Sequence, residues 1–345
     1  MNRIILLLSA VLALAGCSGK GNSEISRAEG GGGNAVYFWK TRFELGKEET
    51  AFLTKNGIGR IYLRYFDVDY EKDPATQEEG IVPVGTLSFV SERPRNVEIV
   101  PVVFITVGAA AYIRDNGLVQ DTAQKIIQRV LNMSSYNGVG PIGEVQLDCD
   151  WTDSTQETFF ALCREVKGLL KGKAVSSTIR LHQLRLPAPP VDRGVLMLYN
   201  TGAMRDPSAG NSILDARDVK TYLGEGPVRY ALPLDFAYPT YGWGIWFRGG
   251  EFMGILHRSD FSDPSRYSDS GDGTFRVCDE HMLEGHRLVP GDMIRLETSR
   301  MEAIRETAAL VKRSFPGRHS NVIYHLDATN LQHYTRDEIK EIFGY

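Results

Sequence analysis

Two carboxylates stand at the end of an apolar run in the middle of the chain. Asp148 and Asp150 close residues 143–150, a predicted buried strand that a helix follows. Residues two apart on a strand share one face, so the two Cα atoms would lie roughly 6.5–7 Å apart. Like charges on one face repel each other, so the pair indicates acid/base chemistry more than stability. The simpler alternative is a helix N-cap plus one structural acid.

The elements that would position this pair alternate along the chain. β-rich runs are separated by helical periodicity or by segments long enough for a crossover, and they centre near residues 36, 62, 101, 146, 178, 197, 232 and 323. Alternation of this kind predicts a mostly parallel sheet, and eight units favour a closed α/β barrel of the (β/α)8 TIM type. No Gly-x-Gly-x-x-Gly motif follows the first run, which argues against a dinucleotide-binding fold.

One segment departs from this alternation. Residues 241–248 and 251–258 are two β-like runs joined by Gly249-Gly250, a link typical of a β-hairpin. We expect residues 35–345 to form a single barrel domain, in which residues 238–298 are an insertion after the seventh strand. The hairpin would lie at the top of the barrel.

Polar residues follow six of the predicted strands, and in a barrel their ends converge on one face, where active sites lie. Asp235 is expected at the end of the seventh strand, as a catalytic partner of Asp148 and Asp150. Arg180 could neutralise Asp148. The residues expected to position a substrate are Asp67, Arg180, His182, Gln183, Tyr199, Asn200, Tyr238, His325 and Asp327.

Aromatic residues add to this face. Trp243 lies in an aromatic-rich segment, Trp151 adjoins the aspartate pair, and Trp39 ends the first strand. Flat aromatic rings supply apolar area with polar edges and stack on sugar rings. Contact with a carbohydrate and simple packing of the hairpin on the barrel rim are both open.

The amino-terminal residues predict a membrane anchor. Residues 1–17 hold Arg3, an apolar stretch too short to span a bilayer, and Leu14-Ala15-Gly16-Cys17, which resembles a bacterial lipobox. The resemblance implies a signal peptide cleaved before Cys17 and lipidation of that residue. Residues 18–34 are rich in Gly and Ser and predict a flexible tether. The folded part would then be lipid-anchored in the bacterial cell envelope, most simply at the outer membrane.

Composition excludes other classes of function. The chain has 345 residues, a net charge of −4 and no long basic stripe, so nucleic acid is not an expected partner. Apart from Cys17, three cysteines remain, Cys149, Cys163 and Cys278, and the first two are expected to be buried free thiols. Asp-x-Asp can hold a cation, but no His-x-x-x-His or Cys-x-x-Cys motif accompanies it, so we predict neither a metal nor a cofactor.

Leu147-Asp148-Cys149-Asp150-Trp151 resembles the fourth-strand signature of chitinase-like glycosidases, glycoside hydrolase family 18. That signature is Asp-x-Asp-x-Glu, in which the glutamate is the general acid. The two aspartates match Asp148 and Asp150, but the glutamate position falls on Thr152. The chain is also similar, over most of residues 35–240, to a group of uncharacterised bacterial lipoproteins with glycosidase-like barrels. This second likeness rests on residues 37–39, 62–68, 146–151 and 178–183, and it implies the fold without a reaction.

Two hypotheses follow for function. In the first, the protein is an envelope glycosidase, with Asp150 as the acid, its pKa raised by Asp148 and Trp151, and Asp235 or Asp148 as the second carboxylate. In the second, the barrel has lost its general acid, as Thr152 indicates, and binds a glycan without cleaving it. A purely structural role in an envelope complex would predict neither binding nor turnover.

Overall fold

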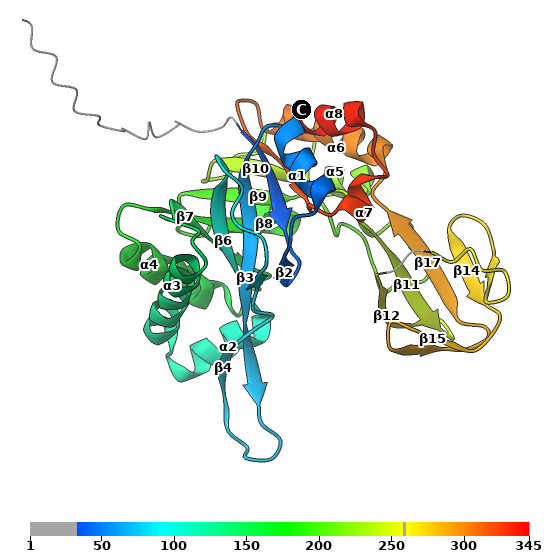
Figure 1. Ribbon diagram of the computed structural model, residues 1–345, viewed down its shortest axis with the longest axis horizontal. Helices are drawn as coiled ribbons and strands as arrows, with labels where there is room; N and C mark the ends of the chain where they lie inside the picture. The colour runs from blue at the N-terminus through cyan, green and yellow to red at the C-terminus, as the bar shows by residue number, and fades with distance from the viewer. Residues whose placement is uncertain (1–32, 258–259, 345) are drawn as a thin grey trace, which may run out of the picture.

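The computed structural model describes residues 33–257 and 260–344, and at its centre eight parallel strands close into a barrel (Figure 1). β1 pairs in parallel with both β3 and β18, which joins the first strand of the barrel to the last. The predicted (β/α)8 TIM-type barrel is therefore confirmed. In chain order the barrel strands are β1 (Asn34–Phe38), β3 (Ile58–Lys72), β6 (Glu98–Ile105), β7 (Glu144–Cys149), β8 (Ala174–Arg180), β9 (Arg193–Met197), β10 (Leu234–Pro239) and β18 (Asn321–Tyr324).

Helices surround this barrel because each has one apolar stripe to bury. In α4, Phe159, Cys163 and Val166 are spaced for one face and are all buried. Cys149, on the neighbouring strand β7, is buried as well, and both thiols are free, as predicted. The helices are α1 (Lys47–Lys55), α2 (Val107–Asn116), α3 (Val119–Tyr136), α4 (Gln156–Leu169), the 3-10 helix η1 (Leu181–Arg185), α5 (Ala216–Leu223), α6 (Met301–Ser314), α7 (Ala328–Leu331) and α8 (Arg336–Gly344). None of these described helices has the length and apolarity to cross a membrane.

The segment between β10 and α6 forms a small β-structure beside the barrel (Figure 1). The predicted hairpin is present as β11 (Gly242–Arg248) and β12 (Glu251–Leu256), and the two linking glycines both have positive φ. The hairpin belongs to a larger sheet of order β12-β11-β17-β14-β13, with its own buried cluster around Trp246 and Ile294. The remaining strands are β13 (Tyr267–Asp269), β14 (Thr274–Val277), β15 (His281–Leu283), β16 (His286–Leu288) and β17 (Met293–Thr298).

The second barrel strand is longer than its sequence predicts. The sequence predicts that Asp67 follows this strand, but β3 continues to Lys72 and pairs with β4 (Glu79–Val84) in an antiparallel arm that projects from the barrel (Figure 1). β2 (Arg42–Phe43) and β5 (Ser88–Phe89) form a separate short parallel pair. Asp67 therefore lies within a strand, where its carboxylate is ion-paired with Arg64.

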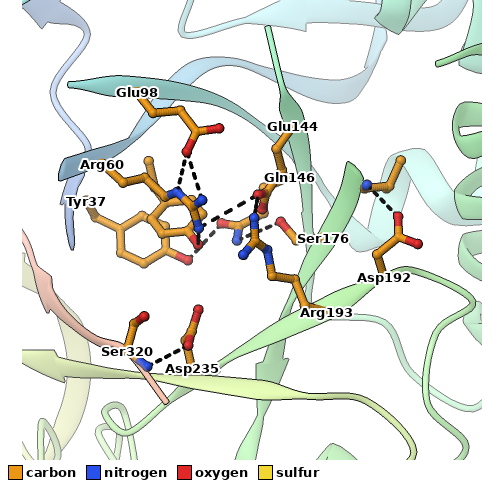
Figure 2. Close-up of polar contacts among 12 residues, drawn as sticks. Tyr37, Arg60, Glu98, Glu144, Gln146, Ser176, Asp192, Arg193, Asp235 and Ser320 are labelled. Atoms are coloured by element: carbon orange, nitrogen blue, oxygen red, sulfur yellow. Dashed lines mark hydrogen bonds and ion pairs between the residues drawn. The ribbon is translucent and has the colours of Figure 1, made fainter. Parts of the chain in front are cut away.

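The interior of the barrel is polar at its amino-terminal end. The side chains at the starts of five strands form a set that we call the lower layer, made of Arg60, Glu98, Glu144, Arg193 and Asp235 (Figure 2). Arg60 binds Glu98 at 2.8 Å and lies 3.8 Å from Glu144, to which Arg193 also binds.

Asp235 in this lower layer corrects a prediction. The seventh strand, predicted to centre near residue 232, spans Leu234–Pro239, so Asp235 is its second residue and lies at the amino-terminal end of the barrel. Its carboxylate accepts the Ser320 backbone N–H at 2.7 Å. Asp148 and Asp150 stand at the opposite, carboxyl-terminal end of β7, so Asp235 cannot share a site with them.

Candidate functional site

Asp148 and Asp150 meet at a single guanidinium. Alternation along β7 and β8 puts both aspartates, Thr178 and Arg180 on the inward face. Arg180 Nη2 lies 3.0 Å from Asp148 Oδ1, and Arg180 Nε binds Asp150. The Thr178 hydroxyl donates to Asp148 Oδ1 at 2.5 Å. These four residues, which we call the upper layer, confirm that Arg180 neutralises Asp148.

The two carboxylates differ in their environment. The side chain of Asp148 is 2% exposed and that of Asp150 is 51% exposed. Burial raises the pKa of Asp148, and Arg180 and Thr178 oppose that rise because they stabilise the charged form. Asp150 is bound by the guanidinium and is half exposed, so its carboxylate can also accept hydrogen bonds from a ligand.

A cavity of about 290 Å³ opens above the upper layer, at the carboxyl ends of β8 and β9. We call it the polar cavity. The predicted site residues Asp150, Arg180, His182, Tyr199 and Asn200 all line it, together with Leu181, Met197, Thr201 and Tyr222.

A second cavity, of about 460 Å³, lies between the barrel and the inserted sheet. We call it the aromatic cavity. Trp39, Asn200, Trp243, His325 and Asp327 line it as predicted, with Lys40, Tyr241, Gly242, His257, Tyr324, Thr329 and Asn330. Asn200 lines both cavities and accepts a hydrogen bond of 2.7 Å from the Tyr241 hydroxyl. The two cavities are therefore adjacent parts of one surface, which we call the groove.

Rings from distant segments hold one another in place in the aromatic cavity. The ring of Tyr324 lies 5.8 Å from Trp39 and 5.7 Å from Tyr241, and Tyr241 lies 5.2 Å from Trp243. The Trp243 indole N–H donates to Glu297 at 2.8 Å. Such edge-on and tilted pairs are favourable arrangements, so the cavity wall is preorganised.

The lysine and the aspartate of the aromatic cavity form an ion pair, and its buried histidine is neutral near pH 7. Lys40 lies 2.5 Å from Asp327, whose other role is to cap α7 by accepting the Asn330 N–H at 3.1 Å. Burial lowers the pKa of His325 to about 4, so this imidazole is neutral near pH 7. Its Nδ1 is buried and has no partner in the described part of the chain, which leaves a polar atom to be satisfied by water or by a ligand.

Three predicted contact residues are buried away from the groove. Tyr238 is fully buried, and by alternation from Asp235 it faces the helix layer. Trp151 is fully buried with its ring 5.4 Å from Phe160. Gln183 accepts the Arg180 backbone N–H at 2.8 Å and reaches the Trp151 carbonyl at 3.5 Å. Their predicted contact with a substrate is therefore wrong, and Gln183 instead fixes the backbone beside Arg180.

Asp67 supports Trp39 indirectly, through Arg64. It holds Arg64, whose guanidinium lies 5.6 Å from the centre of the Trp39 ring. The pair thus braces a wall of the aromatic cavity without lining it.

Sequence reasoning missed several groove residues. Lys40 follows Trp39, and Tyr324 precedes His325, so adjacency to predicted residues was the available signal. Tyr241 was recognised only as part of an aromatic-rich hairpin. Its hydrogen bond to Asn200 joins segments far apart in the chain, which no local pattern reveals.

Thr152 stands at the position where the chitinase-like signature has its acid. It is exposed, and its backbone N–H donates to the Thr155 hydroxyl at 3.0 Å in the turn before α4. A hydroxyl cannot act as a general acid at neutral pH in the way a carboxyl group can. No group of three His, Cys, Asp or Glu residues suited to a metal ion occurs in residues 33–257 and 260–344.

Comparison with known proteins gives one sequence match and several distant structural likenesses. Residues 1–18 match the family model for the prokaryotic membrane lipoprotein lipid attachment site, and these residues lie outside the described part of the structure. The expected lipobox is thereby supported, and the chain carries a lipoprotein-type amino terminus. A comparison with curated protein sequences gives no match.

Similar solved structures include a spore cortex-lytic enzyme and two chitinases. The spore cortex-lytic enzyme SleL of Bacillus cereus has 13% identity, a TM-score of 0.47, and coverage of 87% of this chain and 72% of that chain. Catalytic domain 2 of the Ostrinia furnacalis Group II chitinase has 11% identity, a TM-score of 0.46, and coverage of 85% and 89%. The GH18 chitinase of Cycas revoluta has 11% identity, a TM-score of 0.45, and coverage of 86% and 96%. The barrel assignment rests on the strand pairing described above, independently of these likenesses.

Proposed function

We propose that this protein is a lipid-anchored envelope protein that binds a glycan in the groove without hydrolysing it. The observation that carries the proposal is the binding of Arg180 to both Asp148 and Asp150. Arg180 holds both carboxylates, and one of them is buried, so no unpaired carboxyl group stands in the polar cavity as a proton donor for a leaving oxygen. The absence of a carboxyl group at Thr152 supports the same conclusion.

Carbohydrate is the ligand class that suits the groove. Sugar rings present apolar faces and hydroxyl edges, and the groove pairs aromatic rings with short polar groups. Trp39 and Trp243 offer the apolar surface, and Asn200, Asp150 and His325 offer hydrogen-bonding atoms. The position at the carboxyl ends of the barrel strands is the usual binding face of this fold.

In this proposal a lipid anchor holds the groove near a membrane surface. The lipoprotein match over residues 1–18 supports cleavage before Cys17 and lipidation of that residue. Residues 18–34 would act as the tether between lipid and barrel, and we propose the outer membrane as its location. Metabolic labelling with a lipid precursor would test the lipidation, and Cys17→Ser is expected to abolish the label.

Hydrolysis by paired carboxylates is the second candidate function. The observation that favours it is the unequal environment of Asp148 and Asp150, because acid and base roles need two groups of different proton affinity. Against it, Asp148 does not line either cavity. The general acid and the second carboxylate would therefore not both reach a substrate.

Calorimetry combined with product analysis separates the two functions. Oligosaccharides of several linkages are titrated into the full-length protein in detergent, and each mixture is then examined for cleavage. We expect heat of binding for at least one oligosaccharide with no cleaved product. Cleavage that Asp150→Asn abolishes would overturn the binding proposal, whereas an oligosaccharide series with neither binding nor cleavage would overturn both functions.

A further inference from the structure

We propose that the groove selects amine-bearing saccharides over acidic ones, and that the solvent-facing carboxylate oxygen of Asp150 receives the ammonium group. The inference rests on the proposed function and adds the charge class of the glycan. It follows from a count of charges in the polar cavity, from the pairing of the cations of the groove, and from the character of the neighbouring rings.

The polar cavity holds more carboxylate than cation. Asp148 and Asp150 share Arg180, and Asp148 is sealed beneath the cavity floor. Asp150 uses one oxygen for Arg180 Nε, and its side chain is half exposed to the cavity. Burial and the nearby guanidinium lower the pKa of His182, so this imidazole adds no cation near pH 7. Two carboxylates therefore face one guanidinium.

The charged groups of the aromatic cavity do not alter this balance. Lys40 is bound to Asp327, and His325 is neutral because burial lowers its pKa to about 4. Arg64, behind Trp39, is bound to Asp67. His257 lies at the exposed rim, where its backbone N–H donates to Glu284. Each lysine or arginine among these described residues already has a carboxylate partner.

The aromatic rings act in the same direction. The face of an aromatic ring carries partial negative charge and attracts cations. Trp39, Tyr241, Trp243 and Tyr324 together line the part of the groove next to Asn200. Positively charged substituents along a bound saccharide would therefore find a carboxylate in the polar cavity and aromatic rings in the aromatic cavity. A uronate would have to displace Arg180 or Lys40 from an existing ion pair.

Charge selection of this kind should change the affinity by a modest factor. An exposed ion pair contributes about 1 kcal/mol, which corresponds to about a fivefold change in affinity. The test compares three tetrasaccharides on the full-length protein in detergent: β-1,4-glucosamine, its fully N-acetylated form and galacturonate. Titrations are made slightly below pH 7, where a share of the glucosamine amino groups is protonated and the charges of the groove remain as counted above.

The matched variants are Asp150→Asn and Asp153→Asn. Asp153 is exposed three residues further on and lines neither cavity. We expect wild type to bind the glucosamine tetramer about fivefold more tightly than the N-acetylated tetramer, and to bind galacturonate weakest. Asp150→Asn is expected to remove the preference for the amine, and Asp153→Asn to retain it.

The outcomes separate this inference from the proposed function. Equal affinity for the amine and the N-acetylated sugar, or tight binding of galacturonate, would overturn the charge selection and leave glycan binding intact. A preference that persists in Asp150→Asn would overturn the assigned residue. If none of the three sugars nor any other neutral oligosaccharide binds wild type, the proposed function fails and this inference fails with it.

Discussion

Both ends of the barrel hold carboxylates bound to arginine, but the group at the centre differs: a carboxylate between two arginines at one end, and an arginine between two carboxylates at the other. At the amino-terminal end, Arg60 and Arg193 both approach the fully buried Glu144 (Figure 2). At the carboxyl-terminal end, Asp148 and Asp150 share the single Arg180. The lower layer thus surrounds its buried acid, while the upper layer leaves part of a carboxylate available in a cavity.

The difference shows that ionic residues inside one barrel can have different roles. The lower layer joins the starts of β3, β6, β7 and β9 across the interior, where charges are tolerated only if they are paired. The upper layer stands next to a cavity and to aromatic rings. The comparison predicts that substitutions in the lower layer change mainly stability. Substitutions in the upper layer should change stability and glycan binding together.

The largest expected effect is at Glu144. Glu144→Ala leaves two guanidinium groups without their buried partner and should reduce the free energy of unfolding by about 3–5 kcal/mol. Urea denaturation followed by circular dichroism measures this loss. The exposed Glu48→Gln on α1 is the control and should stay within about 0.5 kcal/mol of wild type. A small effect at Glu144 would contradict a structural role for the lower layer.

Arg180→Met should destabilise by about 3 kcal/mol and also weaken glycan binding. Burial already raises the pKa of Asp148, and the loss of Arg180 raises it further. A carboxyl group whose pKa is raised by folding binds its proton more tightly in the folded state. Its contribution to stability is full below the unfolded pKa and is lost as the pH rises through the folded pKa. The deficit of the variant should therefore grow as the pH rises above about 4, the ordinary pKa of an aspartate. A deficit independent of pH would remove Asp148 from the explanation.

Trp39→Ala tests whether the aromatic cavity binds a glycan through its aromatic rings. Loss of one aromatic wall should weaken a neutral oligosaccharide by about tenfold, equivalent to about 1.4 kcal/mol. Tyr136, which is 90% exposed on α3, provides the control as Tyr136→Ala. Equal affinities for the two variants in calorimetry would show that the groove is not the binding surface.

The smallest effect concerns pH. Because the pKa of His325 is lowered to about 4, affinity for a neutral oligosaccharide should stay constant within about twofold between pH 6 and pH 8. It should fall only when the imidazole becomes charged beside Lys40. A titration midpoint between pH 6 and pH 7 that disappears in His325→Gln would show that this histidine is solvated instead of buried.

Alternation explains what could be predicted about the site. The period of two on β7 and β8 put Asp148, Asp150 and Arg180 on one face, and the structure joins them. Asp235 is misplaced for a different reason, because the predicted bounds of its strand lie too early in the sequence. Pro233 precedes the actual start at Leu234, and a shift of this size moves a residue from one end of the barrel to the other.

Contacts between distant segments could not be predicted from local pattern. Tyr324 stands near the carboxyl end of the chain and Trp39 near its start, and only closure of the barrel brings their rings together. The extension of β3 depends likewise on its pairing with β4. The eight strands themselves were predictable because each carries its own apolar run between helices.

The inserted sheet enters and leaves the barrel through neighbouring residues. Gly242 opposes Thr298 in the β11–β17 pair, and the Ser299 N–H bonds the Tyr241 carbonyl at 3.0 Å. A segment whose two ends lie side by side can be shortened, exchanged or transplanted with little disturbance of its host. Since this segment supplies Trp243 and His257 to the groove, exchange of the module offers a route to new ligands on an unchanged barrel.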